Sequence, residues 1–190
     1  MVPPDTVGAR PRLHPTVVKR KVCLVGEEGV GKTSLIRRFV TGQYDEAYIR
    51  TLGAVATKKT IELPESPLGP VQVDLVILDI TGKRTFLDLF REAYFKGAAG
   101  VLAVFDVTRG RSLVDLAPWI DGVRETVGPL PVIALGNKAD LADRADVNPR
   151  DVESVLGWRL VRTMNSSAKT GENVEEAFIG LTREMLAASG

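Results

Sequence analysis

Apolar runs alternate with turns and amphipathic stretches along the chain from Val17 onward. This alternation of strand-like and helix-like segments is typical of a sheet flanked by helices. The later runs are apolar enough for burial on both faces, as in parallel sheets. We therefore predict an α/β fold whose sheet is six-stranded and mostly parallel, with helices on both faces. The expected strands are Val17–Val25, Ala54–Leu63, Val71–Asp79, Gly100–Asp106, Val132–Leu135 and Leu160–Met164.

The second and third expected strands have no helix-like segment between them. Pro64, Pro67, Gly69 and Pro70 interrupt the chain there instead. Proline and glycine favour turns, and a short turn connects antiparallel neighbours. We therefore expect these two strands to form a hairpin, so that one strand of the sheet runs antiparallel.

Apolar side chains recur at helical spacing in two segments. Such spacing places them on one face of a helix, which would pack against the sheet. Asn148 followed by Pro149 indicates the start of another helix, because asparagine caps a helix and proline suits its first position. Trp119 and Trp158 are expected to be packing residues. The two apolar faces consist of Leu35, Ile36, Phe39 and Val40, and of Val174, Phe178, Leu181 and Met185.

The length of 190 residues suits one domain, whereas two domains would each have a marginal core. Residues 1–16 contain Pro3, Pro4, Pro11 and Pro15 and little apolar periodicity. Such a composition favours a flexible arm over a folded element. We therefore expect a proline-rich arm over residues 1–16 and a single folded domain over residues 17–188.

Charge and cysteine content narrow the classes of partner. Lysine and arginine together number 25 against 24 for aspartate and glutamate, so no overall field would attract nucleic acid or an anionic membrane. The single cysteine, Cys23, lies in an apolar run and is expected to be buried rather than a metal ligand. The sequence shows no membrane-spanning run, signal peptide or lipidation motif. We expect a cytoplasmic protein without a direct membrane anchor.

The segment Gly26–Thr33 reads G-E-E-G-V-G-K-T, which is the phosphate-loop pattern G-x-x-x-x-G-K-[ST]. It follows an expected strand and precedes an expected helix, as this motif requires. Glycines let backbone N–H groups face phosphate oxygens, and a helix N-terminus adds partial positive charge. Lys32 is expected to reach the β- and γ-phosphates, and the Thr33 hydroxyl to bind Mg²⁺. The loop alone leaves the choice between ATP and GTP open.

The segment Asn137–Asp140, N-K-A-D, follows the strand expected at Val132–Leu135. Ligands of open α/β sheets bind at the carboxyl ends of strands. Guanine presents N1–H and an exocyclic amine side by side, and one carboxylate accepts both, whereas adenine has no such pair. Asp140 is the expected acceptor. A surface turn is the alternative, but the order of this segment after a phosphate loop favours a guanine nucleotide.

These motifs resemble the Ras superfamily of small GTPases, and most closely its Rab-like members, across about residues 18–187. The resemblance implies the P-loop small GTPase fold and a GTP-binding domain. The further matches are Thr51 in R-T-L-G, Asp79 in D-I-T-G, Ser167–Lys169 ahead of T-G-E-N-V, and Tyr94–Ala98 leading into Val104–Thr108.

The resemblance implies that Thr51 completes the Mg²⁺ shell with Thr33, and that Asp79 holds the ion through water. Gly82 would donate its backbone N–H to the γ-phosphate, so that loss of this phosphate releases the segments around Thr51 and after Gly82. The implied phosphate-binding residues are Glu28, Gly29, Val30, Gly31, Lys32, Thr33, Ser34, Thr51 and Gly82.

The resemblance also implies a guanine site. Tyr44 would cover the base, although an ordinary surface tyrosine is an equal alternative there. The Ala168 N–H would meet the guanine O6, and Lys138 and Lys169 would lie along the ring and sugar through their aliphatic stems. The implied guanine-binding residues are Tyr44, Asn137, Lys138, Asp140, Ser167, Ala168 and Lys169.

Two positions depart from the pattern of that family. Lys83 stands where most members have the glutamine that orients the attacking water, and Glu28 stands where relatives have a small residue. An ammonium group donates but cannot accept a hydrogen bond, so Lys83 alone cannot position water as an amide does. Either both side chains point to solvent and leave a slow hydrolase, or Glu28 accepts from the water while Lys83 neutralises the γ-phosphate. The catalytic candidates are Lys32, Gly82, Lys83 and Glu28.

The expected function is a GTP/GDP-dependent molecular switch that hydrolyses GTP with Mg²⁺, slowly without a partner. Effector, exchange and activating proteins would bind through switch regions 44–54 and 80–96, and no nucleic acid is expected. An apolar cluster after Gly82 is a candidate partner surface, with packing against a neighbouring helix as the alternative. A GTP-binding signalling or scaffold module without turnover and a P-loop kinase or ATPase are the rival functions, and N-K-A-D argues against the second. The cluster consists of Phe86, Leu87, Leu89 and Phe90.

Overall fold

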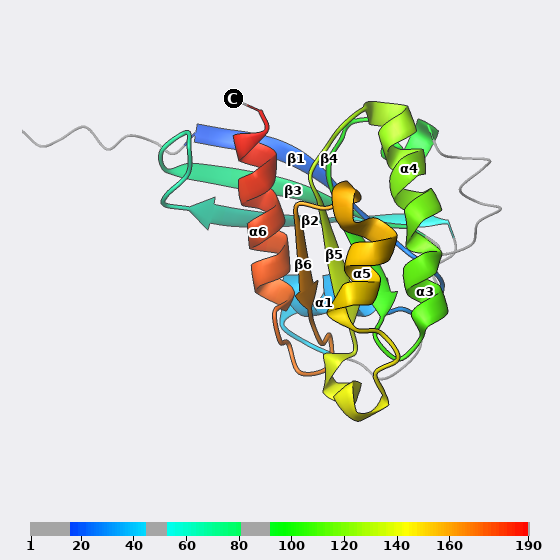
Figure 1. The fold of residues 1–190 in the computed structure, drawn as a ribbon. Helices are drawn as coiled ribbons and strands as arrows, with labels where there is room; N and C mark the ends of the chain where they lie inside the picture. Colours follow the sequence, from blue (N-terminus) through cyan, green and yellow to red (C-terminus); the bar gives the residue numbers. More distant parts are fainter. Residues whose placement is uncertain (1–15, 45–52, 81–91, 190) are drawn as a thin grey trace, which may run out of the picture.

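The computed structural model describes residues 16–44, 53–80 and 92–189, and these form an α/β fold around one twisted sheet (Figure 1). The sheet has six strands in the order β2-β3-β1-β4-β5-β6. β2 pairs antiparallel with β3, and the other neighbours pair parallel, as predicted. The strands are β1 (Thr16–Val25), β2 (Ala54–Leu63), β3 (Val71–Ile80), β4 (Ala98–Asp106), β5 (Val132–Asn137) and β6 (Arg162–Asn165).

The hairpin between β2 and β3 follows the prediction from its prolines and glycine. The two strands pair from Ala54 opposite Ile80 to Leu63 opposite Val71. Figure 1 shows this hairpin extending beyond α6 at the left of the view. The predicted arm of residues 1–16 lies outside the described residues except for Thr16, which begins β1.

Helices cover both faces of the sheet, as predicted, and each face has its own apolar cluster. α1 (Lys32–Thr41) and α6 (Val174–Ala187) pack on one face, where the rings of Phe39 and Phe178 stack with centroids 4.1 Å apart. α3 (Gly110–Val114), α4 (Leu116–Val127) and α5 (Pro149–Leu156) pack on the other face around Trp119. Two short 3-10 helices, η1 (Ala139–Arg144) and η2 (Gly157–Arg159), flank α5.

Several local predictions are confirmed. Cys23 is fully buried between β3 and β4. Asn148 caps α5 as part of a capping box, in which its side chain accepts from Arg150 N and Asp151 N and the Asp151 carboxylate accepts from Asn148 N. Such caps satisfy the N–H groups that a first helical turn leaves without partners.

In the described part of the chain, no helix is long and apolar enough to cross a membrane.

The prediction that the later strands are buried on both faces is wrong for β6. β4 and β5 are buried almost throughout, but Arg162, Thr163 and Asn165 of β6 are exposed. β6 also begins at Arg162 rather than at Leu160. The physical reason is its position at the sheet edge, where it pairs with β5 alone and carries polar side chains.

The prediction that Trp158 is a packing residue is also wrong. Trp119 is buried, whereas 75% of Trp158 is exposed on η2. The Arg159 guanidinium lies 4.3 Å from the centre of the Trp158 ring, and that of Arg124 lies 5.6 Å away. A cation over the indole stabilises a ring that the core does not cover.

Candidate functional site

The phosphate-loop segment connects β1 to α1, and its ends meet two other strands. A Cβ atom on Gly26 would lie 2.1 Å from the carbonyl oxygen of Val104, and one on Gly31 would lie 2.2 Å from Nδ2 of Asn137. Both glycines also have positive φ, of 136° and 100°. A side chain at either position would therefore collide with a neighbour and strain the backbone.

Lys32 lies beneath this loop at the start of α1 and is 6% exposed. Its Nζ donates to the carbonyl oxygens of Gly26 and Glu27 at 2.7 and 2.8 Å. Burial lowers the pKa of Lys32 to about 8, although the negative charges of Asp79, Glu28 and Glu27 act to raise it. An anion in the loop would favour the charged form, so the ammonium group is placed to gain from phosphate binding.

Thr33 and Asp79 bring two oxygen ligands together from α1 and β3. The Thr33 hydroxyl donates to Oδ2 of Asp79 at 2.5 Å, and Asp79 is 4% exposed. Hydroxyl and carboxylate oxygens suit Mg²⁺, which usually takes its remaining ligands from water and phosphate. Among the described residues, no group of three or more histidine, cysteine or acidic side chains could hold a metal ion. The Thr33 and Asp79 oxygens fit an ion that takes its remaining ligands from water and phosphate.

A cavity of about 180 Å³ opens beside the loop and is lined mainly by residues predicted to bind guanine. The carboxylate of Asp140 accepts from the Ser167 hydroxyl at 2.5 Å, which holds the two predicted residues together. Tyr44 is 37% exposed at the edge of this cavity. The lining residues are Gly31, Ser34, Tyr44, Asn137, Lys138, Asp140, Leu141, Ala168 and Lys169.

Asn137, at the end of β5, joins three loops of this site. Its Nδ2 donates to the carbonyl oxygen of Val30 at 2.8 Å, and its Oδ1 accepts from the Ala168 N–H at 3.1 Å. The residue is 1% exposed. A buried amide with both ends paired fixes the distance between the phosphate loop and the base cavity.

Two residues of the site were not found from the sequence. Asp106, at the end of β4, accepts from Lys138 Nζ at 2.6 Å and from Arg109 Nε at 3.1 Å on the same oxygen. Burial acts to raise its pKa, but hydrogen bonds from Lys138 and Thr108 and the charge of Lys138 hold the pKa below its usual value. A carboxylate at the carboxyl end of a buried strand was the available signal.

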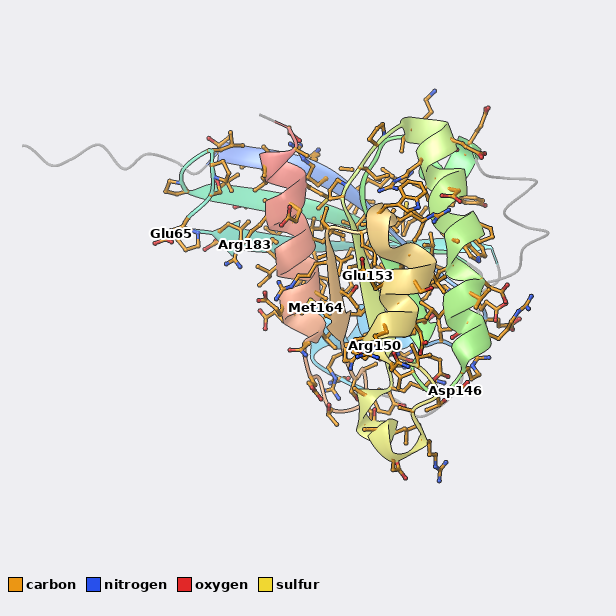
Figure 2. The ribbon with its side chains drawn as sticks, in the orientation of Figure 1. Glu65, Asp146, Arg150, Glu153, Met164 and Arg183 are labelled. Carbon is orange, nitrogen blue, oxygen red and sulfur yellow. The ribbon has the colours of Figure 1, made fainter. Side chains whose placement is uncertain are left out.

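Arg109 reaches from the turn before α3 to the phosphate loop. Its Nη2 donates to the carbonyl oxygen of Glu28 at 3.2 Å. Asp106 and Arg109 thereby link the base-side Lys138 to the outer side of the phosphate loop. The turn after β4 is further held by Asp146, whose carboxylate accepts from Gly110 N at 2.9 Å and which lies at the lower end of the molecule in Figure 2.

The acidic residues of the loop have different surroundings. Glu28 is exposed, and its charge acts on Lys32. Burial, a hydrogen bond to Asp115 and the charge of Asp115 raise the pKa of Glu27.

Thr51, Gly82 and Lys83 lie outside the described residues, as does most of switch regions 44–54 and 80–96. Their predicted roles remain predictions.

Comparison with known proteins agrees with this arrangement. The family model described as "Ras family" matches residues 21–187. Ras-related protein Rab-13 of Rattus norvegicus is 31% identical over 171 residues, which cover 90% of this chain and 81% of that protein. Ras-related protein Rab-8B of Dictyostelium discoideum is 32% identical over 166 residues, covering 87% of this chain and 79% of that protein.

Proposed function

Since the chain belongs to the Ras family and is a Rab-like small GTPase, we propose that it switches between GTP- and GDP-bound states through the loops that meet at Asn137. The observation that carries this proposal is the brace that Asn137 makes from Val30 to Ala168. It places a phosphate loop beside a cavity that contains a carboxylate suited to guanine, Asp140.

The site residues are those proposed from the sequence. Lys32 and the loop N–H groups of residues 28–34 bind phosphates, and Asn137, Lys138, Asp140 and Ser167–Lys169 surround guanine under Tyr44. Thr33 and Thr51 would hold Mg²⁺, and Asp79 would hold it through water; the adjacent Thr33 and Asp79 oxygens support this assignment. The ion neutralises phosphate charge when bound. Gly82 senses the γ-phosphate through its N–H.

Hydrolysis resets the switch. Water attacks the γ-phosphorus, the bond between this phosphorus and the β–γ bridging oxygen breaks, and GDP and inorganic phosphate result. Lys32 and the loop N–H groups stabilise the charge on the phosphates. Because Lys83 replaces the glutamine of most relatives, intrinsic hydrolysis is slow and an activating protein accelerates it.

Identification of the nucleotide that co-purifies with the protein, followed by its turnover, tests this function. We expect GDP in the purified protein and slow phosphate release from loaded GTP. Unlabelled ATP should fail to displace labelled GTP, whereas unlabelled GDP should displace it. Displacement by ATP would instead indicate a P-loop kinase or ATPase.

Glu28 and Lys83 allow a sharper hypothesis, in which the carboxylate accepts from the attacking water and the ammonium neutralises the γ-phosphate. The exposed position of Glu28 and its electrostatic effect on Lys32 motivate it. Single-turnover hydrolysis by Glu28→Gln and Lys83→Ala measures both contributions. Unchanged rates in both variants would exclude this division of labour and leave two solvated side chains.

The second candidate function is a GTP-binding signalling or scaffold module without turnover, and Lys83 is the observation that favours it. Retention of intact GTP over days under single-turnover conditions would support this module.

In either case effector and exchange proteins bind through switch regions 44–54 and 80–96. A cytoplasmic location stays a prediction.

A further inference from the structure

Arg38, in the second turn of α1, directs every nitrogen of its guanidinium group at backbone carbonyls. Nε donates to the oxygen of Ala168 at 2.9 Å, Nη1 donates to that of Gly42 at 2.9 Å, and Nη2 donates to that of Lys169. The planar, fixed fork of donors makes arginine suited to such a set, whereas lysine offers one point charge. Arg38 therefore ties α1 to the loop after β6, which lies 130 residues away in the sequence.

These contacts fix the orientation of the peptide between Ala168 and Lys169. In a planar trans peptide the carbonyl and the following N–H point in opposite directions. With the Ala168 oxygen held on Arg38, the Lys169 N–H points away from Arg38. Ala168 and Lys169 line the base cavity, and Arg38 does not.

The same guanidinium group also acts on the end of α1. Gly42 caps α1 in a left-handed conformation with φ of 72°, and its carbonyl is the third acceptor of Arg38. The Tyr44 ring lies 6.0 Å from the guanidinium carbon, which is within the range of a cation–π contact. Arg38 thus contacts three residues that line the cavity: the backbone of Ala168 and Lys169 and the ring of Tyr44.

The Ala168 N–H, which was expected to meet the guanine O6, donates to Asn137 Oδ1 instead. We propose that Arg38 is a positioning residue for base recognition: by holding the carbonyls of residues 168 and 169 it aims the neighbouring Lys169 N–H at the purine 6-carbonyl and keeps Tyr44 beside the base. This inference rests on the proposed guanine-nucleotide function. Arg38 contacts no nucleotide in this proposal. Its effect is on the discrimination between bases and on the rate of nucleotide release.

The test compares three diphosphates on the parent and on Arg38→Ala. GDP has both the 6-carbonyl oxygen and the 2-amine of guanine. In 6-thio-GDP a sulfur, which is a weak acceptor, replaces O6. IDP keeps the 6-carbonyl but lacks the 2-amine that Asp140 would bind. In the parent both analogues should bind more weakly than GDP. In Arg38→Ala we expect GDP release about tenfold faster, and the preference for GDP over 6-thio-GDP should fall to near one. The preference for GDP over IDP should persist.

Further variants separate positioning from general destabilisation. Arg38→Lys keeps the charge and the helical propensity but has a single donor group, so it should show intermediate discrimination with a melting temperature near that of the parent. Arg183→Ala is the matched control, because Arg183 is an exposed arginine of α6 whose position Figure 2 shows. It should leave both preferences unchanged.

The outcomes are distinguishable. Unchanged discrimination against 6-thio-GDP in both Arg38 variants, or equal loss of the 6-thio-GDP and IDP preferences, would overturn the positioning role and leave Arg38 as a structural residue. A parent that discriminates against IDP but not against 6-thio-GDP would also overturn it. A parent that binds none of the three diphosphates would instead refute the proposed function itself.

Discussion

The Nζ of Lys138 lies 2.6 Å from Oδ2 of Asp106, a carboxylate that is 2% exposed at the end of β4. Arg109 binds the same oxygen and continues to the phosphate loop. The carboxylate thus holds a lysine predicted to lie along the guanine ring and an arginine that contacts the backbone of the phosphate loop. Because one buried anion serves two cations from different loops, its removal should disturb both parts of the site.

Asp106→Asn tests this relationship while keeping the shape of the side chain. Loss of the charged hydrogen bonds should lower the free energy of unfolding at neutral pH by about 2 kcal/mol and accelerate GDP release. Urea unfolding and the release of a fluorescent GDP analogue measure the two effects. Asp143→Asn, a change at an exposed position of η1, is the control.

The pH dependence of the same variant has a definite sign. The pKa of Asp106 is held below its usual value in the folded protein. Its contribution to stability is therefore present above the unfolded pKa of about 4 and is lost as pH falls through the folded pKa. The stability difference between parent and Asp106→Asn should shrink as the pH falls below about 4. A difference that stays constant would assign the effect to packing rather than charge.

Two glycines of the phosphate loop should respond differently to alanine. Gly31→Ala places a Cβ 2.2 Å from Asn137 Nδ2, whereas the nearest atom to a Cβ on Gly29 is an Arg109 nitrogen at 3.9 Å. Both have positive φ, so both pay backbone strain of about 1 kcal/mol. We expect Gly31→Ala to abolish nucleotide binding and Gly29→Ala to retain it. Calorimetric titration with GDP measures this, and equal affinities would contradict it.

Removal of Mg²⁺ should weaken nucleotide binding through Thr33 and Asp79. We expect EDTA to accelerate GDP release from the parent about tenfold or more, because an ion held by these oxygens would neutralise phosphate charge. Thr33→Ala should already release GDP quickly and respond little to EDTA. Ser34→Ala, the neighbouring change, should keep the EDTA response. An EDTA effect of equal size in the parent and in Thr33→Ala would argue against Thr33 as a ligand.

The thiol of Cys23 should be inert in the folded protein. Burial raises its pKa to about 12 from a usual value near 9, which lowers the thiolate fraction about a thousandfold. Iodoacetamide at pH 8.5 should modify Cys23 only in urea. Because the unfolded thiol ionises first, stability should fall as pH rises above about 9 and should fall less in Cys23→Ala. Rapid labelling of the folded chain would contradict this.

The sequence by itself determined the features that depend on local pattern. The period of apolar positions located the strands to within a few residues, and the proline-rich turn between β2 and β3 predicted their antiparallel pairing. Motif chemistry predicted the phosphate loop and the base-reading segment. These signals are readable because each depends on neighbouring residues and on groups that a ligand of known chemistry requires.

Only the tertiary structure decided which side chains meet. Asn137 and Val30 are 107 residues apart, and Arg38 and Ala168 are 130 apart, so no local pattern reports their contacts. The same holds for Trp158, which the core leaves exposed, and for β6, whose edge position a short apolar stretch does not reveal. Long-range contacts follow from strand order and loop geometry, which are set by the packing of the whole chain rather than by any one segment.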